Sequence, residues 1–269
     1  MKGAVAVLVA ALVYAGMGWS DSHAANVQFS AEAVQVAPDK KAHHSRIFVG
    51  DNRVRIEYGQ GEQARVEIYD IANQRAYLLM PARSAYLERK APPGGMMNPM
   101  LPPAQANPCA YVPDAACRQL GQENLEGRTV VKWEMDLKRD GQTKRSLLWM
   151  DQQRLMPIRQ LWPDGTLTEM HFKGRENLNG RQVERWEMIA TQPTGQSMTS
   201  TQWYDPELKI AIREELPGGY YRELRNIRLG RQPDELFRVP PGYHRMTPPP
   251  QAAPAQPGSS PAGRPYPRR

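Results

Sequence analysis

The sequence GQENLEGRTVVKWEM at residues 121–135 returns as GRENLNGRQVERWEM at residues 174–188, an offset of 53 residues. Ten of the fifteen positions are identical, and the similarity continues further along, for example from Trp149-Met150-Asp151 to Trp203-Tyr204-Asp205. A repeat of this length is typical of a duplicated structural unit. We therefore expect residues 121–173 and 174–230 to form two copies of one unit, and function to depend on the surface that they build.

Both copies alternate apolar and polar side chains with a period of two, which is the pattern of a β-strand with one buried face. In the first copy Trp133 and Met135 fall on one face, and in the second copy Trp186 and Met188 do. Turn signals such as Thr194-Gly195 follow these strands. Each copy is therefore predicted to contain four antiparallel strands.

The N-terminal third has the same character, because short β-rich segments between residues 27 and 80 are separated by turn signals at Asp51-Asn52 and Asn73-Gln74. Together these patterns predict mainly β structure, in one antiparallel sheet of about eleven to thirteen strands, and such a sheet curls towards a barrel or splits into two layers.

The two ends of the chain differ from the rest in composition. Residues 1–24 combine Lys2, an apolar run from Ala4 to Val13 and the small-residue sequence Ser22-His23-Ala24, which is the pattern of a cleaved signal peptide. We therefore expect a soluble periplasmic protein, with one β domain at residues 25–245. Residues 246–269 are rich in proline and almost free of large apolar side chains, which predicts a disordered tail.

The charge distribution argues against a nucleic-acid partner. The formal net charge is +7, and the tail residues Arg264, Arg268 and Arg269 contribute three of these charges. In the β domain, arginines alternate with acidic residues along the strands, whereas nucleic-acid binding requires a concentrated basic stripe.

Residues 91–120 interrupt the alternation, since they are rich in proline and methionine and contain both cysteines. A long proline-rich segment inside a compact domain is typical of a lid, and we interpret this one as a lid insertion in which Pro113 to Leu120 form a short helix. Cys109 and Cys117 lie eight residues apart. In an exported chain they are expected to form a disulfide, and they lack the C-x-x-C spacing of a redox motif.

The order of several motifs resembles the periplasmic lipoprotein-carrier superfamily of the LolA and LolB type, particularly its uncharacterised LolA-like members, over residues 27–245. The motifs are Asn52 to Glu57, Val66 to Asp70, Tyr77 to Tyr86 and the terminal Leu236-Phe237-Arg238-Val239-Pro240-Pro241-Gly242-Tyr243. The resemblance implies an unclosed half-barrel of antiparallel strands, with a lid over an apolar concave face that receives acyl chains.

The predicted ligand site is the wall of this hollow together with the underside of its lid. The candidate residues are Trp133, Met135, Trp186 and Met188 of the wall, and Met96, Met97, Met100 and Leu101 of the lid. Tryptophans that recur in both copies, including Trp149 and Trp203, are more often core residues than ligand contacts, and the two roles overlap where the core is also the cavity wall.

Four arginines near strand ends allow two interpretations. They bind an anionic head group, or they pair across strands with acidic residues, which is the interpretation we favour. The arginines are Arg53, Arg55, Arg159 and Arg213, and the expected acidic partners are Glu57, Glu169 and Glu223.

No motif predicts an enzyme. The adjacent His43 and His44 must face opposite sides of a strand, and H-E-x-x-H, G-x-S-x-G and phosphate-loop motifs are absent from the sequence. We predict no cofactor and no metal. A cuprous ion held by thioethers in the segment from Met96 to Met100 is the less favoured alternative.

These patterns lead to two hypotheses about function. The first is a non-enzymatic periplasmic carrier that shelters a lipid or an acylated, lipoprotein-like ligand. The alternative is an envelope-stress sensor similar to the RseB type, which would bind a membrane protein of the cell envelope.

Overall fold

The computed structural model describes residues 27–90, 100, 107–112, 115–139 and 141–247. The strands of the N-terminal third are β1 (Phe29–Val36), β2 (Ala42–Gly50), β3 (Arg53–Tyr58), β4 (Arg65–Asp70), β5 (Arg75–Met80) and β6 (Ala85–Lys90). The turns predicted at Asp51-Asn52 and Asn73-Gln74 join β2 to β3 and β4 to β5.

Each copy of the repeat contributes four strands to the structure, as its sequence predicts. Those of the first are β7 (Ala115–Leu125), β8 (Arg128–Arg139), β9 (Gln142–Asp151) and β10 (Met156–Leu161). Those of the second are β11 (Leu167–Leu178), β12 (Arg181–Thr191), β13 (Ser197–Asp205) and β14 (Ile210–Leu216). Two strands follow, β15 (Tyr220–Leu229) and the two-residue β16 (His244–Arg245).

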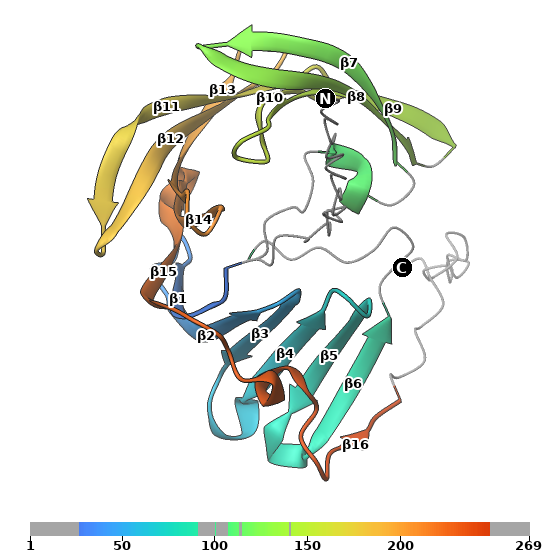
Figure 1. Ribbon diagram of the computed structural model, residues 1–269, viewed down its shortest axis with the longest axis vertical. Coiled ribbons are helices and arrows are strands. Elements are labelled where there is room, and N and C mark those ends of the chain that lie inside the picture. Colours follow the sequence, from blue (N-terminus) through green and yellow to red (C-terminus); the bar gives the residue numbers. More distant parts are fainter. Residues whose placement is uncertain (1–26, 91–99, 101–106, 113–114, 140, 248–269) are drawn as a thin grey trace, which may run out of the picture.

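All sixteen strands form one sheet, in which neighbours along the chain are neighbours in space except at two places. β1 pairs with β15, which joins the N-terminal strands to the second copy, and β16 pairs in parallel with β6. Figure 1 shows that the sheet curves into an open C, with β6 and β7 towards its two ends. The predicted mainly β, unclosed and curved sheet is therefore confirmed.

A glycine at the same place in each copy introduces a β-bulge. The register shifts between Gln119 and Gly121 in β7 and between Phe172 and Gly174 in β11. The φ angles of Gly121 and Gly174 are 137° and 129°, a region that glycine enters readily because it has no Cβ. Bulges increase the local twist of a strand, so the repeated glycine contributes to the curvature of both copies.

The final described segment covers the outer face of the N-terminal strands. Phe237 and the neighbouring Leu236 pack with Val66, Ile68 and Leu79 in one apolar cluster. The ring of Phe237 lies so close to β2 that a Cβ added to Gly50 would stand 2.7 Å from it. The terminal phrase that suggested the LolA-like fold therefore forms part of the core.

Two sequence-based expectations were wrong in detail. The described residues form sixteen strands instead of about eleven to thirteen, because β6, β15 and β16 are additional to the segments between residues 27 and 80 and to the four strands of each copy. Ala115 to Leu120 form the first half of β7 instead of a helix, since they pair with β8 across Cys117 and Met135. The short helical turn of this region is η3 (Pro108–Tyr111), just before the strand.

The predicted disulfide is present and links η3 to β7. Cys109 and Cys117 are joined, with their Cα atoms 5.8 Å apart. The predicted signal peptide at residues 1–24, Met96, Met97 and Leu101 of the lid, and the tail from residue 248 onward lie outside the described residues. Among the described residues, no helix is long and apolar enough to cross a membrane.

Candidate functional site

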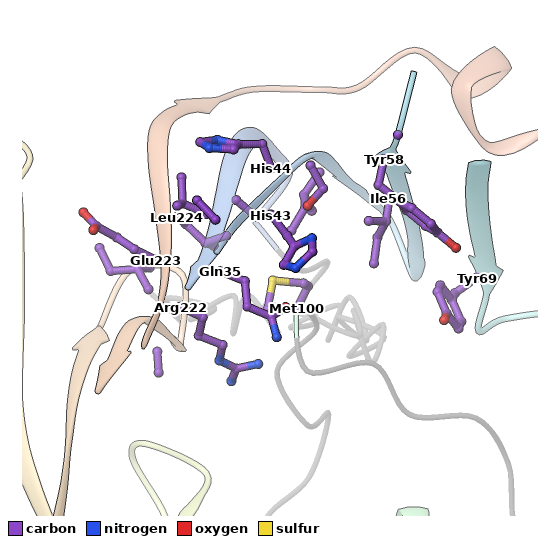
Figure 2. Close-up of a pocket in the computed structure, with 18 of the residues that line it drawn as sticks. Gln35, His43, His44, Ile56, Tyr58, Tyr69, Met100, Arg222, Glu223 and Leu224 are labelled. Atoms are coloured by element: carbon purple, nitrogen blue, oxygen red, sulfur yellow. The ribbon is translucent and has the colours of Figure 1, made fainter. Parts of the chain in front are cut away.

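A cavity of about 760 Å³ opens on the concave side of the sheet, where the N-terminal strands meet β14 and β15. Figure 2 shows residues from both parts of the chain around it. Its apolar lining includes Ala33, Ile47, Ile56, Leu224 and Met100. Volumes between about 300 and 1,000 Å³ are typical of sites for small organic ligands.

The register of β1 explains why residues from distant parts of the sequence share this wall. Ala33 lies opposite Leu224 of β15 on one side and opposite Ser45 of β2 on the other. Ile47 and Ile56 are paired in the same way between β2 and β3. Since directly opposed residues point to the same face of a sheet, these pairs form a continuous apolar floor.

Met100 is the described residue of the predicted lid, and it lies at the cavity. Its side chain is 8% exposed and belongs to the same buried cluster as Ile47 and Val54. In Figure 2 its sulfur lies beside His43. A flexible thioether side chain at this place adapts readily to the shape of a neighbouring ligand.

The polar part of the lining comes from Gln35, His43, Arg222 and Tyr58. Gln35 of β1 lies between His43 of β2 and Arg222 of β15, because it is directly opposite both residues in the sheet. The Nε atom of Arg222 donates to Glu214 at 2.6 Å, which holds the guanidinium in place. Donor groups therefore gather at one edge of an apolar floor.

A second polar group adjoins the cavity on β3 and β4. The carboxylate of Glu67 accepts hydrogen bonds from the hydroxyls of Tyr58 at 2.9 Å and Tyr69 at 2.6 Å. Burial and these hydrogen bonds raise the pKa of both tyrosines above its ordinary value. Both phenols consequently remain protonated and neutral. The carboxylate of Glu67 has both of these tyrosines as hydrogen-bond partners beside the cavity.

Strand alternation separates neighbouring residues of this region. His43 lies opposite Gln35 on one face of the sheet, whereas His44 lies opposite Val34 on the other face (Figure 2). The prediction that adjacent histidines face opposite sides is thus confirmed. Among the described residues, no group of three or more His, Cys, Asp or Glu side chains is placed to hold a metal ion.

The predicted wall residues lie on the same concave face, but further along the sheet. Trp133 and Met135 of β8 lie on the same face of the sheet as Trp186 and Met188 of β12. The strand register shows this, because each of the following residues lies directly opposite the next: Trp133, Leu148, Gln160, Thr168 and Ala190. Cys117 lies opposite Met135. Its disulfide leads to η3, inside the curve in Figure 1, so this face is the concave one.

The structure gives these four residues different surroundings. Trp186 is 0% exposed and lies under the guanidinium groups of Arg128 and Arg154, which are 4.7 and 5.6 Å from its ring. Trp133 is partly exposed, and its indole nitrogen is buried without a hydrogen-bond partner among the residues that the structure describes. None of the four residues lines the cavity of Figure 2, so their contact with a ligand stays a prediction.

All four arginines form ion pairs, but only Arg159 and Arg213 pair with the acidic residue directly opposite on the neighbouring strand. Arg55 pairs with Glu57 at 2.7 Å and Arg159 with Glu169 at 2.7 Å. Arg213 bonds Glu223 at 3.2 Å, and Arg53 bonds Asp234. Cross-strand pairing is therefore confirmed for Arg159 and Arg213, whereas Arg55 pairs with a glutamate of its own strand and Arg53 pairs with an aspartate of η5 (Asp234–Phe237).

Sequence reasoning missed most of the cavity's lining. Gln35, Tyr58, Tyr69 and Arg222 carry no motif, and their spacing along the chain gives no reason to group them. The available signal was alternation in the N-terminal strands, which places Ile47 and Ile56 on apolar faces. It could not show that β15 would lie beside β1.

Comparisons with known proteins concern the fold. The sequence matches no protein-family model, and no curated protein is detectably similar to it. Among solved structures, the chain is similar to a LolA superfamily protein, NE2245 from Nitrosomonas europaea, with 13% identity and a TM-score of 0.35, over 80% of this chain and 90% of that one. It is also similar to a DUF1329 family protein from Desulfovibrio piger, with 15% identity and a TM-score of 0.32, over the same shares of the two chains.

The predicted unclosed, curved sheet of antiparallel strands is confirmed by the structure itself. At these identities and TM-scores the likeness says nothing about a ligand. The ligand has to be inferred from the cavity of this chain.

Proposed function

We propose that this protein is a non-enzymatic binding protein that shelters the acyl part of a lipid or of an acylated protein in the cavity between β1–β4 and β14–β15. One observation carries the proposal: the cavity has an apolar floor on a curved sheet and donor groups at one edge. An amphiphile has the same division between an apolar chain and a polar head.

The energetics favour a ligand with a chain. Burying one CH2 group contributes roughly 0.8 kcal/mol, so even a short acyl chain on the floor formed by Ala33, Ile47 and Ile56 offsets much of the cost of association. Arg222, His43 and Gln35 are placed to donate hydrogen bonds to a phosphate or carboxylate head. Arg222 is already oriented by Glu214, which reduces the entropy lost on binding.

We propose that this activity lies in the periplasm, in line with the predicted signal peptide, because an acyl chain there needs protection from water between membranes. A hollow on an open sheet suits such a carrier, because a ligand can enter and leave without unfolding of the sheet. Met100 lies among the floor residues, and we propose that it adjusts to fill the space that a ligand leaves.

Binding of a fluorescent fatty-acid probe to the purified chain tests the proposal. Ala33→Trp fills the floor of the cavity and is expected to weaken probe binding about tenfold or more. Glu32→Trp is the matched control, because Glu32 is the exposed neighbour on the other face of β1. Equal binding by wild type and Ala33→Trp would place the probe elsewhere and contradict the proposal.

Native mass spectrometry of protein isolated from the envelope identifies the natural ligand. The expected result is a bound amphiphile that Ala33→Trp reduces. Repeated preparations without any amphiphile would overturn the carrier function. Crosslinking in cells that captures one dominant membrane protein instead of lipid would favour the alternative, a stress sensor.

A further inference from the structure

A second hollow, of about 830 Å³, lies at the far end of the concave face, between the ends of the β8–β9 and β10–β11 hairpins. Most of its lining residues carry a polar or charged side chain. They include Gln142, Lys144, Asp164 and Thr168, and a single aromatic ring, that of Trp162, stands among them.

Trp162 is 43% exposed although it has a fixed orientation. Its indole N–H donates to the hydroxyl of Thr168 at 2.9 Å, and its backbone N–H donates to the carbonyl of Thr166 at 2.9 Å. The N–H of Gly165 closes the turn on the carbonyl of Trp162 at 3.0 Å. The ring is therefore a rigid apolar plate that remains open to solvent.

The charged groups of the hollow differ in how they are engaged. Arg145 is committed to Asp136, with two hydrogen bonds of 2.7 and 2.8 Å. Asp164 accepts the N–H of Thr166 at 3.0 Å, and this bond lowers the pKa of its carboxyl. Lys144 forms no ion pair with the described residues. One ammonium group and one carboxylate are thus presented beside the ring.

The second copy of the repeat shows that the fold does not require these residues. At an offset of 54 residues, Leu216 replaces Trp162, Met198 replaces Lys144 and Gly218 replaces Asp164. The hairpin still forms, with Pro217 where the first copy has Pro163. The turn therefore does not require an indole, an ammonium group or a carboxylate at these three positions.

The geometry points to a saccharide-binding site in this hollow, with Trp162 as the platform for a pyranose ring. One face of a pyranose carries C–H groups and packs on an indole, while its hydroxyl groups at the edge need donors and acceptors. Lys144, Asp164 and Gln142 supply these around the ring. Lys144 further favours sugars that carry a carboxylate.

An acyl chain in this hollow would give no hydrogen bonds to Lys144, Asp164 or Gln142. A saccharide supplies such bonds. The site is independent of the amphiphile cavity, since the two hollows share no lining residue.

Titration calorimetry and ligand-observed NMR with soluble tetrasaccharides test the site. The probes are cellotetraose, chitotetraose and tetragalacturonic acid. At least one is expected to bind, and Trp162→Leu, which installs the residue of the second copy, is expected to weaken that binding about tenfold or more. If the acidic tetramer binds, Lys144→Met is expected to weaken it more than a neutral one.

Two controls separate this site from the proposed carrier function. Met198→Ala changes the counterpart of Lys144 in the second copy and is expected to leave saccharide binding unchanged. Trp162→Leu is expected to leave fatty-acid binding unchanged, and Ala33→Trp to leave saccharide binding unchanged. Failure of all three tetramers at millimolar concentration, or equal binding by wild type and Trp162→Leu, would overturn the inference.

Discussion

In both copies of the repeated unit, a tryptophan on the third strand donates its indole N–H to a glutamate on the first. Trp149 bonds Glu123 at 2.6 Å in the first copy, and Trp203 bonds Glu176 in the second. An arginine lies over each ring, Arg159 in one copy and Arg213 in the other. The same contacts therefore occur inside both copies, because equivalent side chains pack against each other within each unit.

The copies differ where they meet other parts of the chain. In the turn after β9, Arg154 reaches Glu184 of the second copy with bonds of 2.7 and 2.8 Å. At the equivalent place after β13, Leu208 is buried in the apolar cluster that contains Phe29 and Val54. One copy therefore contacts its neighbour through an ion pair, and the other contacts the N-terminal strands through an apolar side chain. The contacts inside the repeated unit are the same in both copies. The residues that contact other parts of the chain differ, because each copy has different neighbours in the sheet.

The largest effect is expected from comparing the equivalent tryptophans Trp186 and Trp133. Trp186→Ala is expected to lower the free energy of unfolding by about 3 to 5 kcal/mol, because the side chain is fully buried. Trp133→Ala is expected to cost less than half as much, because Trp133 is partly exposed and its N–H lacks a partner among the described residues. Urea denaturation followed by circular dichroism measures both. Equal losses would mean that the two positions have equivalent surroundings.

The ion pair between the copies comes next. Glu184→Gln is expected to cost about 3 kcal/mol, because it removes one of the two carboxylates that pair with Arg154, in a site where the Glu184 side chain is only 3% exposed. The double variant Arg154→Leu with Glu184→Val takes the residues of the opposite copies, Leu208 and Val131. It is expected to recover most of that loss in the same urea experiment. A double variant no more stable than Glu184→Gln would contradict this account.

Removing the disulfide sharpens the comparison between β7 at the edge of the sheet and β11 in its interior. Cys109→Ser with Cys117→Ser is expected to lower the free energy of unfolding by about 2.5 kcal/mol, from the entropy gained by the unfolded chain. Hydrogen exchange should show protection lost in β7 and retained in β11, because β11 has neighbours on both sides. Equal loss in both strands would instead indicate that the disulfide stabilises the sheet as a whole.

The smallest effect is expected from pH. The hydrogen bonds from Arg154 lower the pKa of Glu184 below its ordinary value. The resulting stabilisation is fully present above the pKa that this glutamate has in the unfolded chain, about 4.3, and is lost as pH falls through the lower folded-state pKa. Unfolding free energy measured between pH 7 and pH 3 should therefore fall less steeply below pH 4 in the double variant than in wild type. Identical slopes would exclude a contribution from this pair.

The sequence by itself determined the class of fold and the duplicated unit. Alternation with a period of two specifies a strand locally, since it needs only one buried face, and the repeated phrase predicts four strands in each copy. Cys109 and Cys117 could be paired because they were the only cysteines in the chain. The close packing of Phe237 against Gly50 was not visible in the sequence.

Only the tertiary structure decided which strands meet. The pairing of β1 with β15 joins Ala33 to Leu224 and Gln35 to Arg222, residues almost two hundred positions apart. That pairing creates the cavity, and no local pattern encodes it, because any strand with an apolar face satisfies the same alternation. The sequence predicted a ligand site at Trp133 and Trp186, whereas the cavity lies where the N-terminal strands meet β14 and β15. Long-range register therefore fixed the candidate site, while local periodicity fixed the sheet on which it lies.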